Sequence, residues 1–478
     1  MHRVDSTTGK SSKLRYSPHE VRVGLRYCLI AWIFGSTFFA ITTGAVFSSF
    51  LTKYLRTDDS TYGLIMSIGS IGVLFQLLGS YVVERTGRTK RNFLYLVTFH
   101  RLAWLGVAAI PLFFPVTAGH HTTVQIVLVS VLVLLSAIAA NYGGAGWTTW
   151  MSDIVPKQVA GIFFGYRARI GMVSMVVAAW GMAILLDAVN GHGWMYAVVF
   201  SFAAVMGAAD ILSFIPVREI PRPVDAKPPT WMELITIPWR DKMFCSFALY
   251  TVITWIAYMM MGPFTWRFCF DTTASHGLNM SVSRANFLLF ILPTITMAWV
   301  APFWGKAIDR FGPKPVLATS SFCQIFIPAW WILVHPGSTW LIPVIVIAGG
   351  LTWPGIDQVN FYMQLKGFPN VKRTAYIAMF LVVFGLAGML GTIVGGYCAT
   401  FWQHHLQNIS GLPSWISHYH LVFASAILLR AAAFVVLLPR LPLPGVGDKA
   451  VVAKTIVTGM YSSLSNVSGK RKGVPGTK

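Results

Sequence analysis

Long apolar runs separated by short polar turns dominate this sequence. A helix that spans a membrane needs about 20 mostly apolar residues. The pattern predicts twelve such helices in an all-α integral membrane protein. We expect them at residues 27–50, 62–83, 93–115, 123–148, 168–187, 194–216, 243–264, 285–304, 315–335, 339–362, 374–402 and 418–440.

Polar segments divide the chain into two halves of six helices each. Residues 217–242 are polar and Pro-rich, and they form the predicted cytoplasmic linker between the halves at 27–216 and 243–440. An N-terminal arm (1–26) precedes the first half. The tail (441–478) is rich in Ser, Gly and Lys, which predicts disorder.

The composition agrees with a membrane protein. Of the 478 residues, 55% are apolar and only 11% are charged, and the mean hydropathy is +0.62. Soluble domains carry about 25% charged residues. The net charge of +21 could suggest a nucleic-acid partner, but the cations lie between the apolar runs and in the tails. We therefore expect no nucleic acid, and basic tails that lie against anionic lipid headgroups.

The positions of Lys and Arg predict the orientation. Thirty-one of the 37 lie on one face, four lie on the other, and two fall inside predicted helices. Cytoplasmic loops carry the excess of Lys and Arg, so both termini should be cytoplasmic. The first apolar run is too long for a cleaved signal peptide, and we expect a multi-pass protein of a bacterial-type plasma (inner) membrane.

A short basic turn occurs twice. The stretch from Gly305 to Lys314 reads Gly-Lys-Ala-Ile-Asp-Arg-Phe-Gly-Pro-Lys, and Glu84 begins a similar stretch. The two acids, Glu84 and Asp309, lie 225 residues apart, which indicates two homologous halves in the same orientation. A conformational latch could be built from these turns, since an acid can hold a neighbouring Arg or a helix end. The alternative is an ordinary basic cytoplasmic loop. The latch candidates here are Glu84, Arg85, Gly87, Arg88, Asp309, Arg310, Gly312 and Lys314.

A second internal similarity supports the duplication. Trp147 precedes Arg167 by 20 residues, and Trp353 precedes Arg373 by the same 20. Chance can also produce this spacing, because Trp and Arg are common in the chain.

Two ionisable residues lie at similar depth in the first half. Arg101 and Asp210 are each a few residues inside a predicted helix, and at 1.5 Å per residue their depths agree within a few ångström. Charges inside a membrane are costly and need partners. We expect a structural ion pair, and a contact with substrate is the alternative.

Asp357 lies in a helix that Pro354 and Gly355 interrupt. A carboxylate in a partly dry cavity has its charged form disfavoured, so it could bind and release a proton near neutral pH. It is the candidate for proton coupling or substrate contact. The alternatives are a structural pair with Arg430 and a polar helix end near cytoplasmic water.

No motif points to an enzyme, a cofactor or a metal. The five Cys show no paired spacing, and the adjacent pairs His120–His121 and His404–His405 lie in predicted outer loops. Phosphate-binding, nucleophile-elbow and zinc-protease motifs are absent from the sequence. We expect a protein that is not an enzyme and has no metal site.

The repeat and its motifs resemble the major facilitator superfamily. Gly305, Asp309, Arg310, Gly312 and Lys314 follow its loop signature closely, whereas the first half has Ser80 and Glu84 in place of Gly and Asp. The loop from Asp153 to Arg167 is also similar, although Ala160 replaces the usual Arg. The resemblance implies a secondary transporter that works by alternating access, usually as a monomer. It adds Asp153 and Arg167 to the latch.

The resemblance also implies that the first, fourth, seventh and tenth helices line a cavity. Aromatic and amide residues on three of these helices suit a polar organic solute, by stacking and a few hydrogen bonds. The alternative is packing and placement at the membrane interface. These candidates are Asn141, Tyr142, Trp147, Trp255, Tyr258, Trp353 and Gln358.

The sequence therefore favours a secondary active transporter that moves a small organic solute, with coupling to protons. A non-transporting sensor or assembly factor on the same fold is the second possibility, and a membrane enzyme is the third. The solute, the direction of transport and the coupling ion have no signature in the sequence.

Overall fold

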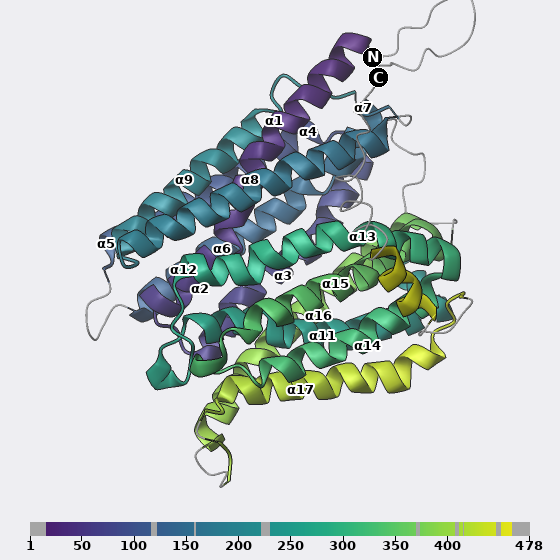
Figure 1. Cartoon of the computed structure of the whole chain (residues 1–478). Helices are drawn as coiled ribbons and strands as arrows, with labels where there is room; N and C mark the ends of the chain where they lie inside the picture. The colour runs from purple at the N-terminus through teal and green to yellow at the C-terminus, as the bar shows by residue number, and fades with distance from the viewer. Residues whose placement is uncertain are drawn as a thin grey trace, which may run out of the picture. The chain divides into compact units, whose positions relative to one another are not determined.

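The computed structural model describes residues 16–115, 122–156, 159–220, 230–369, 373–406, 411–413, 415–445 and 451–460. Within them the regular structure is helical, with no strand (Figure 1). Twelve long helical segments follow one another, six before and six after the linker, as predicted. Eleven of them are long and apolar enough to cross a membrane.

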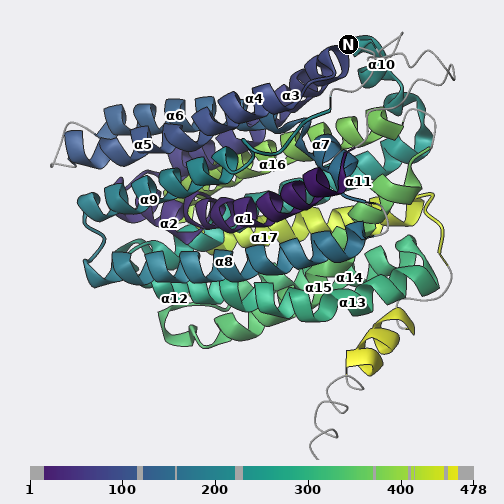
Figure 2. The ribbon, with the colours of Figure 1, turned by 90° about the horizontal axis from the view of Figure 1, so that it is seen from above.

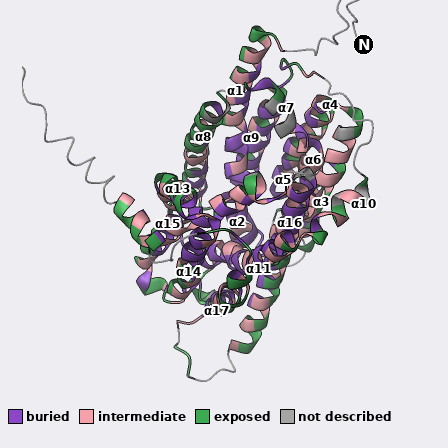
Figure 3. Ribbon diagram, turned by 90° about the vertical axis from the view of Figure 1, so that its right-hand side faces the viewer, coloured by how far each residue is buried: buried purple, intermediate pink, exposed green. Residues whose placement is uncertain are grey.

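The first compact unit comprises residues 1–47 and 71–228. Within it, α5 packs on α6 and α9, and α1 packs on α8 and α9. Figure 3 shows α9 mainly buried, whereas α8 carries many exposed positions. Its helices are α1 (Pro18–Thr42), α4 (Lys90–Asn92), α5 (Thr98–Phe113), α6 (Thr122–Gly144), α7 (Trp147–Ile154), α8 (Ala160–Ala188) and α9 (Gly193–Leu212), with a π-helical turn at Phe93–Val97.

The second unit comprises residues 48–70 and 229–478. Within it, α11 packs on α16 and α17, and α15 packs between α13 and α14 (Figure 2). Its helices are α10 (Trp231–Thr236), α11 (Lys242–Phe270), α12 (Val282–Asn286), α13 (Leu292–Phe311), α14 (Pro313–Trp331), α15 (Leu341–Tyr362), α16 (Arg373–His405) and α17 (His418–Ala432). Helix α2 (Ala45–Ser49) lies at the boundary, and α3 (Asp59–Thr86) contributes its start to this unit and its end to the first.

Among the twelve described segments, α14 is the one that is not apolar enough to count as a membrane span, and its polar side chains bond inside the protein. It carries three prolines, and its Ser and Thr residues lower the hydropathy. Gln324 donates to the Gly349 carbonyl at 3.0 Å, and Ser321 lies 2.7 Å from the Tyr250 hydroxyl. These contacts satisfy groups that would be costly to expose to lipid.

Two segments are helical where the sequence predicted no helix. The first helix begins at Pro18 inside the expected arm, because Ser17 and Glu20 form a capping box. In the expected disordered tail, residues 451–460 form a helix. Val452 and Ile456, one turn apart, are buried in the core of the second unit. Their spacing places both apolar side chains on one face, which gives this short helix its packing.

The duplication is visible in the bonds of two lysines. Lys90 Nζ donates to the carbonyls of Ile215 and Val217, both at 2.7 Å. Lys314 Nζ donates to those of Pro439 and Leu441, at 3.0 and 2.7 Å. The sequence separations are 125 and 127 residues in both halves. Each lysine thus holds the end of the last helix of its half, where carbonyls lack partners.

Both basic turns also use a glycine with positive φ. Gly87 has φ +63° and Gly312 has φ +82°. This backbone conformation costs a side-chain-bearing residue free energy, and glycine adopts it readily. The turn therefore requires these two glycines.

We expect Lys314→Met to lower the free energy of unfolding by about 1–2 kcal/mol, since two carbonyls at a helix end lose a charged donor. Chemical denaturation of the detergent-purified protein measures it. Lys306→Met, at an exposed lysine of α13, is the matched control and should cost less than about 0.5 kcal/mol. Equal losses would show that the carbonyl contacts carry no special stability.

Candidate functional site

Three of the predicted aromatic residues lie together in the second unit. Trp255 and Tyr258 on α11 are 5.9 and 4.8 Å from the ring of Trp353 on α15, measured between centroids. Phe384 on α16 stacks on Trp255 at 4.0 Å. We call these four rings the aromatic cluster. The sequence analysis did not name Phe384 as a candidate. This residue lies on α16, and the resemblance does not assign that helix to the cavity.

Asp357 follows Trp353 by one helical turn on the same face of α15, and it is exposed. No ion pair that the structure describes includes this carboxylate. Gln358, its neighbour, donates to the Ala301 carbonyl of α13 at 2.7 Å. The amide of Gln358 therefore joins two helices, while Asp357 and the aromatic cluster offer a carboxylate beside ring faces.

Arg430 is buried. Its partners differ from Asp357, which the sequence analysis considered as an alternative partner. Its guanidinium donates to the Gln324 carbonyl at 2.8 Å and lies 4.1 Å from the ring centroid of Tyr258. The pairing of Asp357 with Arg430 is not among the ion pairs of the described residues. The Arg430 guanidinium instead contacts the aromatic cluster through a cation–π interaction with the ring of Tyr258.

The candidates of the first unit have packing contacts. Asn141 donates to the Ala137 carbonyl of its own helix at 2.9 Å. Trp147 belongs to an apolar core, and the Arg167 guanidinium lies 4.9 Å from its ring. The same guanidinium lies 4.0 Å from Trp32. Tyr142 is half-buried on α6.

Arg101 and Asp210 come together inside the first unit. Arg101 Nη2 lies 2.8 Å from Asp210 Oδ2, and their side chains are 5% and 8% exposed. The Arg101 guanidinium also lies 4.1 Å from the ring of Phe38 and 4.8 Å from that of Phe39. Helix α5 supplies the cation and α9 the anion, so the pair joins two helices that pack closely.

The remaining latch candidates lie at helix ends. Glu84 is in the last turn of α3, and the Arg85 guanidinium lies 4.5 Å from the ring of Tyr81. Arg88 is exposed on the turn that follows. In the second unit, Asp309 and Arg310 are exposed at the end of α13.

Asp153 is the last of these candidates, and it is exposed at the end of α7. His405 packs on Phe401, and His120 and His121 lie outside the described residues. Over the described ranges, no group of three or more His, Cys, Asp or Glu could hold a metal ion.

Sequence reasoning missed a buried ionic cluster at the predicted outer end of the second unit. Asp59, the first residue of α3, forms an ion pair with Arg267 of α11, and His418 Nε2 lies 3.0 Å from the other Asp59 oxygen. The Tyr419 hydroxyl lies 2.8 Å from Asp271 Oδ2 and 3.2 Å from Asp59 Oδ1. These five residues are the outer cluster.

The outer cluster joins segments that are far apart in sequence. Residues 48–70 come from the first half of the chain, yet they pack on helices of the second half. Tyr62 donates to the Pro263 carbonyl at 2.9 Å, and Lys53 Nζ to the Met280 carbonyl at 2.6 Å. Gly63 and Gly396 permit the close approach, since a Cβ on Gly63 would lie 3.0 Å from the Gly396 Cα.

One sequence signal could have revealed this cluster. Arg267 is one of only four Lys and Arg residues on the predicted outer face. Two acids and a histidine begin or end the neighbouring apolar runs, at Asp59, Asp271 and His418. A cation close to two acids and a histidine at helix ends indicates an ion pair, but the sequence does not say which helices are in contact.

We expect Arg101→Ala to lower the free energy of unfolding by about 3–5 kcal/mol, because Asp210 would keep a buried charge without its partner. Yield and thermal unfolding in detergent measure this. The double variant Arg101→Ala/Asp210→Ala should recover part of the loss, since it removes both charges. A single variant as stable and as well expressed as the wild type would contradict a structural role for the pair.

Comparisons with known proteins agree with this geometry. Residues 269–467 match a family model described as "Major Facilitator Superfamily". A search of curated protein sequences finds no match.

Several solved transporter structures share the fold. A mutant form of the nucleoside transporter NupG has a TM-score of 0.67 at 14% identity, over 87% of this chain and 99% of its own. A bacterial homolog of the human lysosomal transporter Spinster gives 0.62 at 12% identity, over 93% and 99%. The D-xylose-proton symporter gives 0.61 at 14% identity, over 88% and 99%. At these identities the likeness shows the fold alone.

The family is one of membrane transporters and not of enzymes, as the sequence motifs led us to expect. The family match over residues 269–467, less than half of the chain, and the twelve-helix fold of the solved transporters together make this chain similar to the major facilitator superfamily.

Proposed function

We propose that this protein is a secondary active transporter that moves a small polar organic solute together with protons, by alternating access. It acts as a monomer in a bacterial-type plasma (inner) membrane. The observation that carries the proposal is the exposed carboxylate of Asp357 beside the aromatic cluster. An ionisable group in a membrane-spanning helix needs a reason, and proton exchange supplies one.

The surroundings of Asp357 support a solute that contains a ring and polar groups. Trp255, Tyr258 and Trp353 offer ring faces, and Asp357 accepts hydrogen bonds. Nucleosides and sugars both have this chemistry. Two structural neighbours are described as a nucleoside transporter and a D-xylose-proton symporter, which makes these two classes the first to test.

The outer cluster supports the alternating-access part of the proposal. Asp59, Arg267 and His418 are buried and bond segments from both halves of the sequence at one end of the second unit. A path to the outside must separate residues 48–70 from α11 and α17. In our proposal the outer cluster stabilises the closed outer end and breaks when that end opens.

The basic turns serve as the corresponding latch on the cytoplasmic side. Arg88, Asp309 and Arg310 are exposed on their turns, so they can change partners at little cost. Lys90 and Lys314 stay fixed on carbonyls and keep the turns in place. Asp153 and Arg167 extend this latch in the first unit. Arg101 and Asp210 remain paired throughout the transport cycle as a structural element.

The coupling role of Asp357 is tested with Asp357→Asn in proteoliposomes, using radiolabelled uridine and xylose. We expect loss of uphill accumulation driven by a pH gradient, with exchange of solute across the membrane retained. The amide keeps the shape of the side chain and resembles the protonated acid, with one acceptor oxygen and an N–H donor, but it cannot release or take up a proton. Asp187→Asn, at the predicted outer end of α8, is the matched control and should accumulate solute normally. Accumulation by the Asp357 variant would reject proton coupling at this residue.

The outer cluster is tested by labelling a cysteine at position 48, where Ser48 is 1% exposed and lies 2.7 Å from the Tyr62 hydroxyl. We use a background without native cysteines and a membrane-impermeant maleimide. Arg267→Gln should raise the labelling rate at least about tenfold, since it weakens a buried pair by more than about 1.4 kcal/mol. Arg284→Gln removes an exposed cation of the same face and should leave the rate unchanged. Equal rates in both variants would contradict a closing role.

A further inference from the structure

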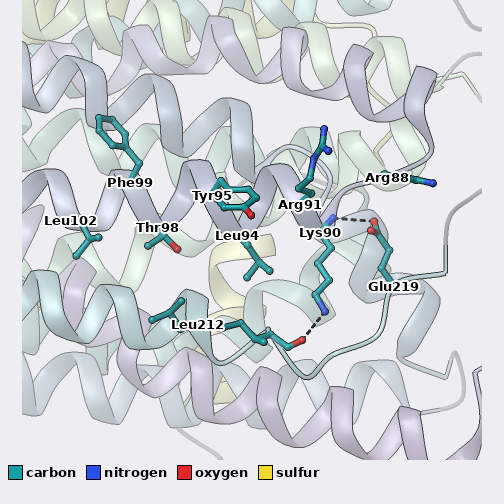
Figure 4. A pocket seen from close by; sticks show the side chains of 11 residues that line it. Arg88, Lys90, Arg91, Leu94, Tyr95, Thr98, Phe99, Leu102, Leu212 and Glu219 are labelled. Carbon is teal, nitrogen blue, oxygen red and sulfur yellow. Dashed lines mark hydrogen bonds between the residues drawn. The ribbon is translucent and has the colours of Figure 1, made fainter.

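A groove of about 860 Å³ opens on the side of the first unit, between the third and sixth membrane-spanning segments (Figure 4). This volume falls within the range of sites that hold small organic molecules. One wall comes from the segment of Leu94 to Leu102, and the other from Leu212 and Ile215 at the end of α9. Arg88, Lys90, Arg91 and Glu219 form its rim.

The walls of the groove are apolar and exposed. Tyr95 is 74% exposed, Phe99 50% and Ile215 55%. No other element of the described first unit covers these side chains, so in a membrane they are accessible to lipid acyl chains. The residues that line the groove belong to the first unit, whereas Asp357 and the aromatic cluster belong to the second.

Two of the four charged groups at the rim are already engaged. The Glu219 carboxylate accepts the backbone N–H groups of Thr89 and Lys90, the latter at 3.0 Å. The Lys90 ammonium donates to the carbonyls of Ile215 and Val217. Arg88 and Arg91 are exposed, and neither has an ion-pair partner in the part of the chain that the structure describes. The rim thus carries two guanidinium groups that no described acid pairs, beside the apolar walls of the groove.

The second half shows that these two arginines are not needed for the turn. Its Lys314 makes the same contacts as Lys90, but Pro315 stands where Arg91 would be, and the shorter turn has no counterpart of Arg88. A chain segment also covers the place: the Lys314 N–H donates to the Pro444 carbonyl at 3.3 Å, and a Cβ on Gly445 would meet Pro315. Within the described residues, the turn of the second half therefore has neither of these two cations and is covered by residues 444 and 445.

We propose that this groove binds one anionic phospholipid, with its phosphate on Arg88 and Arg91 and an acyl chain along Tyr95, Phe99 and Ile215. The charge of the rim matches the headgroup, and the predicted orientation puts the rim at the cytoplasmic surface of the membrane, where anionic lipids gather. Guanidinium groups bind phosphate oxygens in pairs of hydrogen bonds. The apolar walls suit the chain and exclude a free phosphate ion as the best ligand.

Native mass spectrometry of the full-length, detergent-purified protein tests the proposal. Palmitoyl-oleoyl phosphatidylglycerol is compared with phosphatidylcholine of the same chains. We expect the anionic lipid to be retained about twentyfold more strongly, because each cation near an anionic headgroup contributes about a factor of five. Arg88→Gln/Arg91→Gln should reduce its affinity to that of phosphatidylcholine.

Two further variants and one competitor make the result decisive. Arg240→Gln/Lys366→Gln removes two exposed cations elsewhere and should keep the preference. Leu212→Trp fills the groove at an exposed position, leaves both arginines, and should also lower phosphatidylglycerol binding. Equal retention of both lipids, an equal loss in the Arg240/Lys366 variant, or unchanged binding in the Leu212 variant would overturn the proposal. Displacement of the lipid by 10 mM inorganic phosphate would assign the rim to free phosphate instead.

Discussion

A polar group inside a hydrocarbon layer must find its partner within the protein, and this constraint governs the whole structure. Arg101 meets Asp210, Arg267 meets Asp59, and Arg430 meets the Gln324 carbonyl. Each of these contacts joins helices that are distant in sequence. Asp357 differs because it is exposed and outside the ion pairs of the described residues. In our proposal this carboxylate is the group that meets the solute and the proton.

Comparison of the two halves distinguishes the features that the fold requires from the features that we assign to function. Lys90 and Lys314 hold the last helix of each half through the same two carbonyl contacts, and Gly87 and Gly312 make the same turn. Asp357 with its aromatic cluster occurs in the second half, and the open groove lined by Arg88 and Arg91 occurs in the first. These unshared features carry the two proposals, because packing of the repeat does not explain them.

The sequence predicted the twelve helices and the basic turns well, because the length of an apolar run and the glycine at a turn are local signals. It predicted that Arg101 and Asp210 lie at equal depth, and the structure brings them together. The sequence analysis missed the outer cluster, since no local pattern indicates that Asp59 contacts Arg267 and His418. Phe384 was missed because the resemblance does not assign α16 to the cavity. The helix at 451–460 was missed because Ser, Gly and Lys around it hide the one-turn spacing of Val452 and Ile456.

The central claim is that a small polar solute binds the folded protein, and a thermal-shift screen of the detergent-purified chain tests it most directly. The panel holds nucleosides, sugars, amino acids, organic acids and cationic drugs, at pH 5.5 and 7.5. The account predicts that one class raises the melting temperature, because a ligand at a hundredfold excess over Kd stabilises the folded state by about 2.7 kcal/mol. A monodisperse, well-folded protein that no compound stabilises at either pH would contradict it.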